Sequence, residues 1–202
     1  MPIVGRSLEE AANNFVDYLN GVLFKTITQV PIQVLPVREK DCVSLGFRQA
    51  AGPQLAELHS KYGKLFLSLS QNCTSHKRSD GLHELRTRRY WYYIYDRDEK
   101  PIIRWEYARD WEQKGTKSDP KFYCRGHVQG AIPLSLNRAD VTLDDVHTPT
   151  GYVTVEDIAR FCIEDLEVRF KDRPPDWHEL LVASYARFCK DFTRGEDCDG
   201  DR

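Results

Sequence analysis

The sequence has no long run of apolar residues. No stretch approaches the roughly 20 apolar residues that a membrane-spanning helix needs, and Met1 to Ser7 lacks the basic and apolar regions of a signal peptide. The net charge is only −2, so bulk charge draws the chain neither to nucleic acid nor to acidic membranes. These absences predict a soluble, cytoplasmic protein that contacts no membrane and binds polyanions, if at all, through a local patch.

Several catalytic and cofactor motifs are also missing. The chain has neither G-x-x-x-x-G-K nor G-x-G-x-x-G, which argues against nucleotide-driven motors and dinucleotide oxidoreductases, and it has no G-x-S-x-G nucleophile motif. Its six cysteines include no C-x-x-C pair, so free thiols are expected in place of a disulfide framework or a compact zinc site. We expect no cofactor.

What is present suits one globular domain. A chain of 202 residues can bury a substantial core, and 41% hydrophobic with 30% charged residues is an ordinary globular composition. We predict a single α+β domain over residues 1–196, with a helical part at about 1–80, a sheet plus C-terminal helices at about 81–196, and a disordered tail at 197–202.

The N-terminal part predicts helices around an extended segment. Ser7 and Glu10 have capping-box spacing, and apolar residues at helical spacing continue from Leu8 to about Phe24. Two prolines make residues 30–47 extended, because proline disrupts a helix interior. Gly52-Pro53 is expected to open a second helix that ends near Tyr62, and residues 72–81 are polar and predicted to form a loop.

The second half predicts a short antiparallel β-meander packed against the N- and C-terminal helices. Alternating apolar residues indicate strands at Thr87–Tyr95, Pro101–Tyr107 and Phe122–Val128. Helices are expected after Thr154 and after Asp176, each of which is followed by an acidic residue three positions later. The predicted fold class is α+β.

The third strand carries the most chemistry. Successive side chains of a strand point to opposite faces, so Arg125, His127 and Gln129 share one face. If the meander pairs in register, Arg104 and Glu106 of the neighbouring strand lie beside Arg125 and His127. Guanidinium groups bind phosphate and imidazoles transfer protons near neutral pH, so this face is a candidate phosphate site.

A second histidine, His147, follows Asp144-Asp145 in a turn-like segment. We predict that His127 and His147 form a proton-transfer pair and that Arg104, Arg125 and Gln129 bind the ligand. Two alternatives remain open. The face is simply solvated, or the two histidines and two aspartates ligate a metal, although their spacing matches no compact metal motif.

A third candidate surface lies where basic residues run into aromatic ones. Arg88 and Arg89 precede the segment Tyr90–Tyr93, and together they suit RNA because arginine meets phosphate and aromatic rings stack on bases. The competing interpretation is that strand alternation buries about half of these aromatics, since aromatic-rich strands usually form core and cross-strand pairs.

Several short motifs occur in a fixed order between roughly Arg86 and Phe170. They are an Arg/Tyr strand (Arg88-Arg89-Tyr90), a strand with Trp105, an H-x-Q strand (His127-Val128-Gln129), and an H-x-P-T-G turn (His147–Gly151) before a helix with Val155-Glu156-Asp157-Ile158. In these motifs the chain resembles a group of small bacterial proteins that includes toxins of the TumE type. This resemblance implies a bacterial origin and a toxin–antitoxin or defence context in which RNA is the target.

The leading hypothesis is therefore a protein that binds a phosphate-bearing ligand, RNA above all, and acts as a metal-independent ribonuclease. The alternative is a protein-interaction or assembly subunit without enzymatic activity. In that alternative, the Leu8–Leu23 helix and the aromatic hairpin carry an apolar interface for a protein partner.

Overall fold

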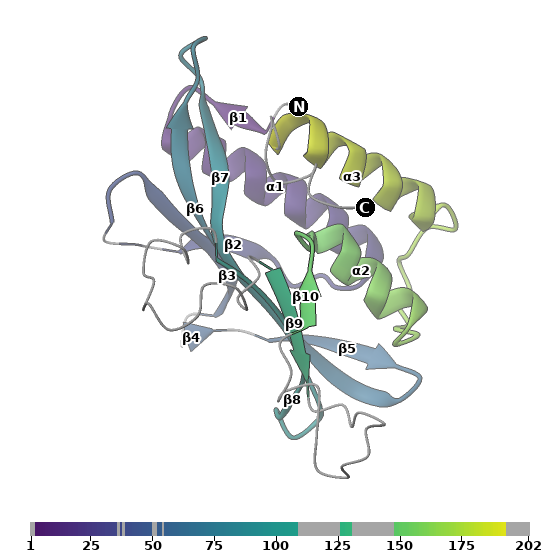
Figure 1. The fold of residues 1–202 in the computed structure, drawn as a ribbon. Coiled ribbons are helices and arrows are strands. Elements are labelled where there is room, and N and C mark those ends of the chain that lie inside the picture. The colour runs from purple at the N-terminus through teal and green to yellow at the C-terminus, as the bar shows by residue number, and fades with distance from the viewer. Residues whose placement is uncertain are drawn as a thin grey trace.

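The computed structural model describes residues 3–35, 37, 39–49, 52–53, 55–108, 126–130 and 148–192. The helices are α1 (Leu8–Thr26), α2 (Val155–Glu164) and α3 (Trp177–Phe192). The strands are β1 (Val4–Gly5), β2 (Ile32–Leu35), β3 (Cys42–Gln49), β4 (Gly52–Pro53), β5 (Ala56–Ser60), β6 (Gly63–Lys77), β7 (His83–Tyr95), β8 (Pro101–Ala108), β9 (Gly126–Gly130) and β10 (Thr148–Thr150). The predicted α+β class is confirmed (Figure 1).

The sheet is larger than the predicted three-stranded meander. Its strands lie in the order β10-β9-β8-β7-β6-β3-β2, with β1 paired to β7, β5 to β6 and β4 to β3. Each of these pairings is antiparallel. The predicted meander corresponds to β7, β8 and β9; β10 extends it on one side, and β6, β3 and β2 extend it on the other with residues from the N-terminal part.

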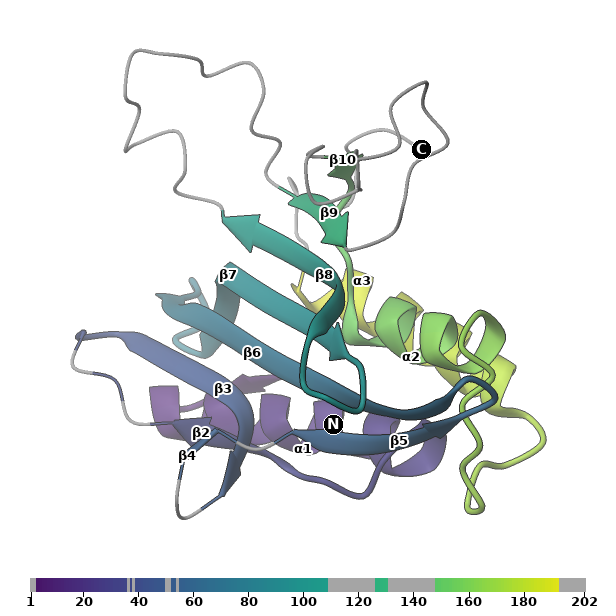
Figure 2. The ribbon, with the colours of Figure 1, turned by 90° about the horizontal axis from the view of Figure 1, so that it is seen from below.

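The helices lie on one face of the sheet (Figures 1 and 2). Strand alternation in β7 turns Tyr90, Tyr92 and Ile94 toward this face, where they are fully buried. Apolar residues of α1, α2 and α3 complete one continuous core. Trp91 and Tyr93 point to the opposite face and are only half-buried, so the sheet has one core face and one polar, aromatic face.

The helix starts follow the predicted capping chemistry. The Ser7 hydroxyl accepts a hydrogen bond from the Glu10 amide at 3.1 Å, and the Glu10 carboxylate accepts one from the Arg6 amide at 2.6 Å. Thr154 and Asp157 form a full capping box at the start of α2. These side chains satisfy amides that have no partner inside a helix, which fixes where α1 and α2 begin.

The helix predicted from Gly52-Pro53 to about Tyr62 is wrong, because β5 and β6 form a hairpin there. The turn depends on Gly63, whose φ of +109° is open to glycine, and on the Ser60 hydroxyl, which accepts from the Tyr62 amide at 3.0 Å. The polar loop predicted at 72–81 is also wrong over Asn72 to Lys77, which continue β6. Residues 1–80 therefore supply much of the sheet in addition to one helix.

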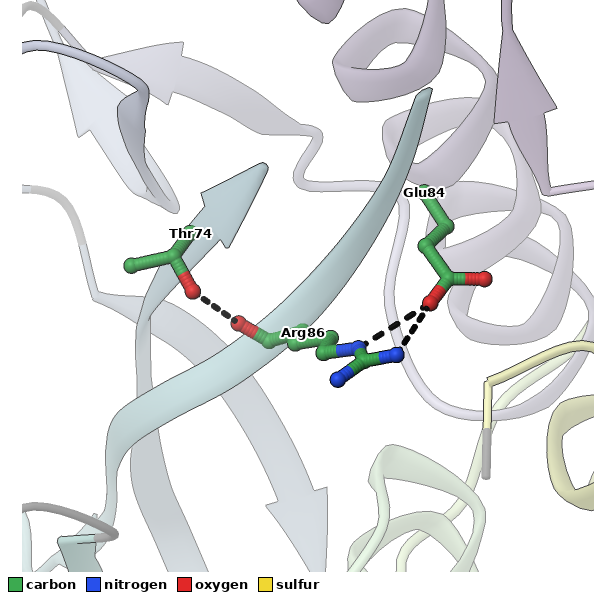
Figure 3. Close-up of polar contacts among 3 residues, drawn as sticks. All are labelled: Thr74, Glu84 and Arg86. Atoms are coloured by element: carbon green, nitrogen blue, oxygen red, sulfur yellow. Dashed lines mark hydrogen bonds and ion pairs between the residues drawn. The ribbon is translucent and has the colours of Figure 1, made fainter. Parts of the chain in front are cut away.

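The polar end of β6 pairs with the start of β7 in a hairpin that twists away from the sheet (Figure 1). Figure 3 shows its polar contacts: Thr74 donates to the backbone carbonyl of Arg86 at 3.5 Å, and the Arg86 guanidinium reaches the Glu84 carboxylate at 2.8 Å. Polar contacts within and between the two strands take the place of apolar packing at this end of the hairpin. Because the polar end of β6 has few apolar residues, its sequence is typical of a loop.

None of the helices in the described part of the chain is long and apolar enough to span a membrane. The four cysteines that the structure describes (Cys42, Cys73, Cys162 and Cys189) are free thiols, as expected. The predicted tail at 197–202 and the first part of the predicted third strand, 122–125, lie outside the described residues.

Candidate functional site

The candidate site lies on the face of the sheet that no helix of the described chain covers, which we call the helix-free face. Cross-strand pairing places its residues in rows, because directly paired residues point to the same side of a sheet. One row runs Ser70, Trp91, Glu106, His127, and the next runs Ser68, Tyr93, Arg104, Gln129. Glu106 thus lies beside His127, as expected, and Arg104 lies beside Gln129, whereas Arg125 lies outside the described residues.

Glu106 is the centre of the cluster. Its Oε1 accepts a hydrogen bond from the Tyr93 hydroxyl at 2.6 Å, and its Oε2 lies 3.5 Å from Nε2 of His127. Arg104 donates from Nε to Oε1 of Gln129 at 2.9 Å and lies 3.9 Å from Oε1 of Glu106. Three side chains from three adjacent strands therefore meet around one carboxylate, and Gln129 joins them through Arg104; we call Tyr93, Arg104, Glu106, His127 and Gln129 the Glu106 cluster.

Partial burial makes Arg104, Glu106 and His127 both reachable and electrostatically coupled, whereas Gln129 is buried. Side-chain exposure is 31% for Arg104, 25% for Glu106 and 17% for His127. The contact with His127 lowers the pKa of Glu106, with burial opposing it and the Tyr93 bond adding to it, so Glu106 is ionised at neutral pH. Burial and then the bond to Glu106 raise the pKa of Tyr93, which keeps its hydroxyl a donor.

A carboxylate that contacts a histidine Nε2 can hold the imidazole in one orientation and stabilise its protonated form. This is the arrangement by which proteins position a histidine for proton transfer. The neighbouring guanidinium of Arg104 adds a donor fork of the kind that binds phosphate or carboxylate. The cluster thus has the parts for acid–base chemistry on an anionic substrate.

The two arginines of the basic and aromatic segment have different environments. Arg88 forms an ion pair with Glu39, with Nη1 2.8 Å from both carboxylate oxygens. The register of β6 against β7 shifts between Asn72 and Cys73, and Arg89 then pairs with Asn72 on the helix-free face. Arg89 therefore lies on the same face as the Glu106 cluster, whereas Arg88 is engaged with an exposed glutamate.

The other predicted site residues lie outside the described residues. These are Arg125, His147, Asp144 and Asp145. The chain enters β10 directly after His147, and the first residue of β10, Thr148, pairs with Val128 of β9. Within the described ranges, no group of three or more His, Cys, Asp or Glu side chains is placed to hold a metal ion.

Sequence reasoning did not assign a role to Tyr93. Strand alternation was expected to bury about half of the aromatic segment, and the structure confirms this division. Tyr90 and Tyr92 stack at 4.3 Å between ring centroids in the core, while Trp91 and Tyr93 lie on the helix-free face. The available signal was the period of two itself, combined with the position of Tyr93 opposite Arg104 in the hairpin.

The predicted protein interface on the N-terminal helix is limited by the fold. Phe15, Leu19, Val22 and Leu23 of α1 are buried in the core, so the apolar side of this helix packs against the sheet and the other helices. Within the predicted aromatic hairpin, Trp91, Tyr93 and Tyr95 are half-buried on the helix-free face.

A second polar cluster lies among the helices and is structural in character. The buried Glu156 of α2 accepts hydrogen bonds from the Tyr18 hydroxyl of α1 and, at 2.7 Å, from the Ser184 hydroxyl of α3. It joins the three helices inside the core and is closed to a substrate. Comparison with known proteins adds no further assignment: no protein-family model, no curated protein and no solved structure matches this chain.

Proposed function

We propose that the helix-free face binds single-stranded RNA and that the Glu106 cluster cleaves it without a metal ion. The observation that carries this proposal is the contact of the Glu106 carboxylate with both the Tyr93 hydroxyl and the His127 imidazole, on a sheet face beside Arg104. RNA contains its own nucleophile, the 2′-hydroxyl, so its cleavage needs only proton transfer and a group that stabilises the phosphate charge.

In the proposed reaction, His127, oriented by Glu106, takes the proton of the 2′-hydroxyl. The 2′ oxygen then bonds to the adjacent phosphorus, and the bond from phosphorus to the 5′ oxygen breaks. Arg104 stabilises the negative charge on the phosphate oxygens. The leaving 5′ oxygen takes a proton from an imidazolium, the role predicted for His147. The products are a 2′,3′-cyclic phosphate and a 5′-hydroxyl end.

The rest of the helix-free face supports single-stranded substrates. Trp91 and Tyr93 are half-buried and offer ring surfaces on which bases stack, while Arg89 brings a positive charge to the same face. A duplex hides its base faces and would not use these rings. With the resemblance to TumE-type toxins, this activity suggests a bacterial toxin–antitoxin or defence role.

The test uses the full chain and a fluorescent single-stranded RNA in buffer that contains EDTA. We expect cleavage to products with cyclic phosphate ends, and we expect His127→Ala and Glu106→Gln to reduce the rate by about 100-fold or more, the usual scale for losing a general acid or base. His76→Ala, which changes an exposed histidine on β6 of the same sheet, is the matched control and should cleave as the wild type does.

A DNA strand of the same sequence separates binding from chemistry. It lacks the 2′-hydroxyl, so we expect it to bind and to remain intact. If neither RNA nor DNA binds at low salt, the proposed function is wrong, and the interaction hypothesis, in which Trp91 and Tyr95 contact a protein partner, is favoured. If RNA binds but the His127→Ala variant cleaves as well as the wild type, the binding face stands and the assigned chemistry fails.

A further inference from the structure

A surface pocket lies away from the Glu106 cluster, between β5 and the segment that connects α2 to α3. It is lined by His59 of β5, by Ile163 of α2, and by Glu167, Val168, Arg169, Phe170, Lys171 and Arg173 of the connector. Figure 2 shows β5 and α2 running toward the same end of the molecule. The proposed function makes no use of this pocket.

Backbone and side-chain bonds fix the pocket wall. The Arg169 amide donates to the His59 carbonyl at 2.7 Å, and the Val168 amide donates to the Cys162 carbonyl at 2.9 Å. Arg173 donates from Nε to the carbonyl of Thr26, at 3.0 Å, and from Nη2 to the carbonyl of Val168. The connector is thereby tied to the sheet and to the end of α1, so the pocket is formed before any ligand arrives.

Positive charge in the pocket exceeds the negative charge that faces it. The one acidic lining residue, Glu167, forms an ion pair with Lys61 at 2.5 Å. Within the described chain, no carboxylate pairs with Arg169, Lys171 or Arg173. Burial lowers the pKa of Arg173, and no carboxylate offsets that effect. A partly desolvated guanidinium without an acidic partner favours a bound anion.

Strain in the backbone occurs at the same place. Glu167 has a φ of +47°, in the left-handed region that residues other than glycine seldom adopt. This conformation turns the chain between α2 and the pocket wall and brings Val168 into the core and Arg169 out to the pocket rim. Residues held in such conformations are concentrated at ligand sites, where the surrounding structure compensates for the strain.

We propose that this pocket binds a small organic anion, in which a phosphate or carboxylate group is joined to an apolar body. Arg169, Lys171 and Arg173 contact the anionic group, and the apolar body packs on Ile163, Val168 and Phe170. Two arginines suit both anionic groups, because a guanidinium offers paired donors to either one. The proposal is independent of RNA binding on the helix-free face.

The test adds small-molecule probes to the full chain and monitors binding by the NMR signals of the backbone amides. The probes are 2-naphthyl phosphate and 2-naphthoate, which separate the two anionic groups, with 2-naphthol as the uncharged match and inorganic phosphate as the anion without a body. We expect the amide chemical shifts of His59 and of residues 163–173 to change saturably with one or both organic anions. The dissociation constants of 2-naphthol and of phosphate alone should be higher by about tenfold or more, which corresponds to about 1.4 kcal/mol.

Charge reversal completes the test. Arg169→Glu and Lys171→Glu change exposed side chains and should each weaken binding of the organic anion by about tenfold. Arg160→Glu, an exposed reversal on α2 that does not line the pocket, should leave binding unchanged. Arg169→Gln removes only the charge and is used if a reversal perturbs folding. Equal binding of 2-naphthol and the anions, or reversals without effect, would overturn the proposal.

Discussion

Glu106 links the stability of the protein to the chemistry of its helix-free face. Its folded-state pKa is lowered, chiefly by the contact with His127. A lowered carboxyl pKa adds stability above the unfolded value of 4.5, and this stability is lost as the pH falls through the folded value. The carboxylate that we assign to catalysis thus also stabilises the fold at neutral pH.

The corresponding prediction concerns Glu106→Gln. We expect the variant to be less stable than the wild type by roughly 1 kcal/mol at neutral pH, since a partly exposed charged hydrogen bond is lost. The difference should begin to shrink near pH 4.5, where the carboxyl of the unfolded wild type takes up its proton, and it should be lost as the pH falls through the lower folded-state pKa. Urea unfolding at several pH values measures it, and a difference that stays constant with pH would contradict the assignment.

Glu156 has the opposite behaviour. Burial raises its pKa, although hydrogen bonds from Tyr18 and Ser184 oppose the shift. A raised carboxyl pKa gives stability that is fully present below the unfolded value of 4.5 and is lost as the pH rises through the folded value. The buried charge therefore disfavours folding at neutral pH.

We predict that Glu156→Gln, which keeps an oxygen acceptor and removes the charge, is at least as stable as the wild type at neutral pH. Its stability should also change less between about pH 4.5 and neutrality. The control is Glu179→Gln, an exposed carboxyl on α3. Should Glu156→Gln lose stability at every pH, the ionised carboxylate is itself the group that the helices require.

At the level of elements, β9 depends on two glycines that pack closely against neighbouring backbone. A Cβ added at Gly126 would lie 2.7 Å from the carbonyl oxygen of Gly151, and one added at Gly130 would lie 2.5 Å from that of Ile102. Contacts this short with backbone cannot be relieved by a side-chain rotation. The strand that carries His127 is therefore positioned by glycines at both of its ends.

We predict that Gly126→Ala and Gly130→Ala each destabilise the protein by about 1–3 kcal/mol, as overpacking does, and displace β9. RNA cleavage should fall in both variants even where folding persists, because His127 moves relative to Glu106. Gly21→Ala is the matched control: its Cβ meets nothing within 4 Å in α1, so it should stabilise by about 0.5–1 kcal/mol. Thermal unfolding and the cleavage assay measure both effects.

An element can be predicted from the sequence when the pattern that determines it spans only a few neighbouring residues. The capping residues Ser7 and Thr154 and the alternating aromatics of β7 act over a few positions, and the elements that they mark were predicted correctly. Leu55, Leu58 and Tyr62 have helical spacing, yet Leu58 lies in a hairpin whose turn is set by Gly63. The first part of β6 alternates like a strand, but its polar end from Asn72 to Lys77 has no such local pattern, and pairing with the long strand β7 decides the conformation there.

The candidate site divides in the same way. The register of β8 against β9 follows from the meander, so the proximity of Glu106 and His127 was predictable. The face of Tyr93 follows from the alternation of β7, but the contact of its hydroxyl with Glu106 does not, because Tyr93 pairs directly with Arg104 and reaches Glu106 diagonally. The pairing of Arg88 with Glu39 joins residues 49 positions apart, which no spacing rule anticipates.

For the whole molecule, contacts between the two ends of the chain determine whether it behaves as one domain. Tyr18 of α1 donates to Glu156 of α2, and Arg173 donates to the carbonyl of Thr26 at 3.0 Å. Tyr152, just before α2, contacts the hydroxyl of Thr87 in β7 at 2.7 Å. These bonds are buried or partly buried and connect residues from 65 to 147 positions apart, so the helices and the sheet share one core.

We therefore predict a single cooperative unfolding transition for the whole chain. The helix signal in far-UV circular dichroism and the near-UV signal of the tyrosines packed at Tyr90 and Tyr107 should change together. Tyr18→Phe removes one donor to Glu156 and leaves this buried carboxyl with one partner fewer. It should lower the free energy of unfolding by about 1–3 kcal/mol and shift the midpoints of the far-UV and near-UV transitions equally. Two separated transitions, or a shift in the helix signal alone, would mean that the helices and the sheet unfold as separate units.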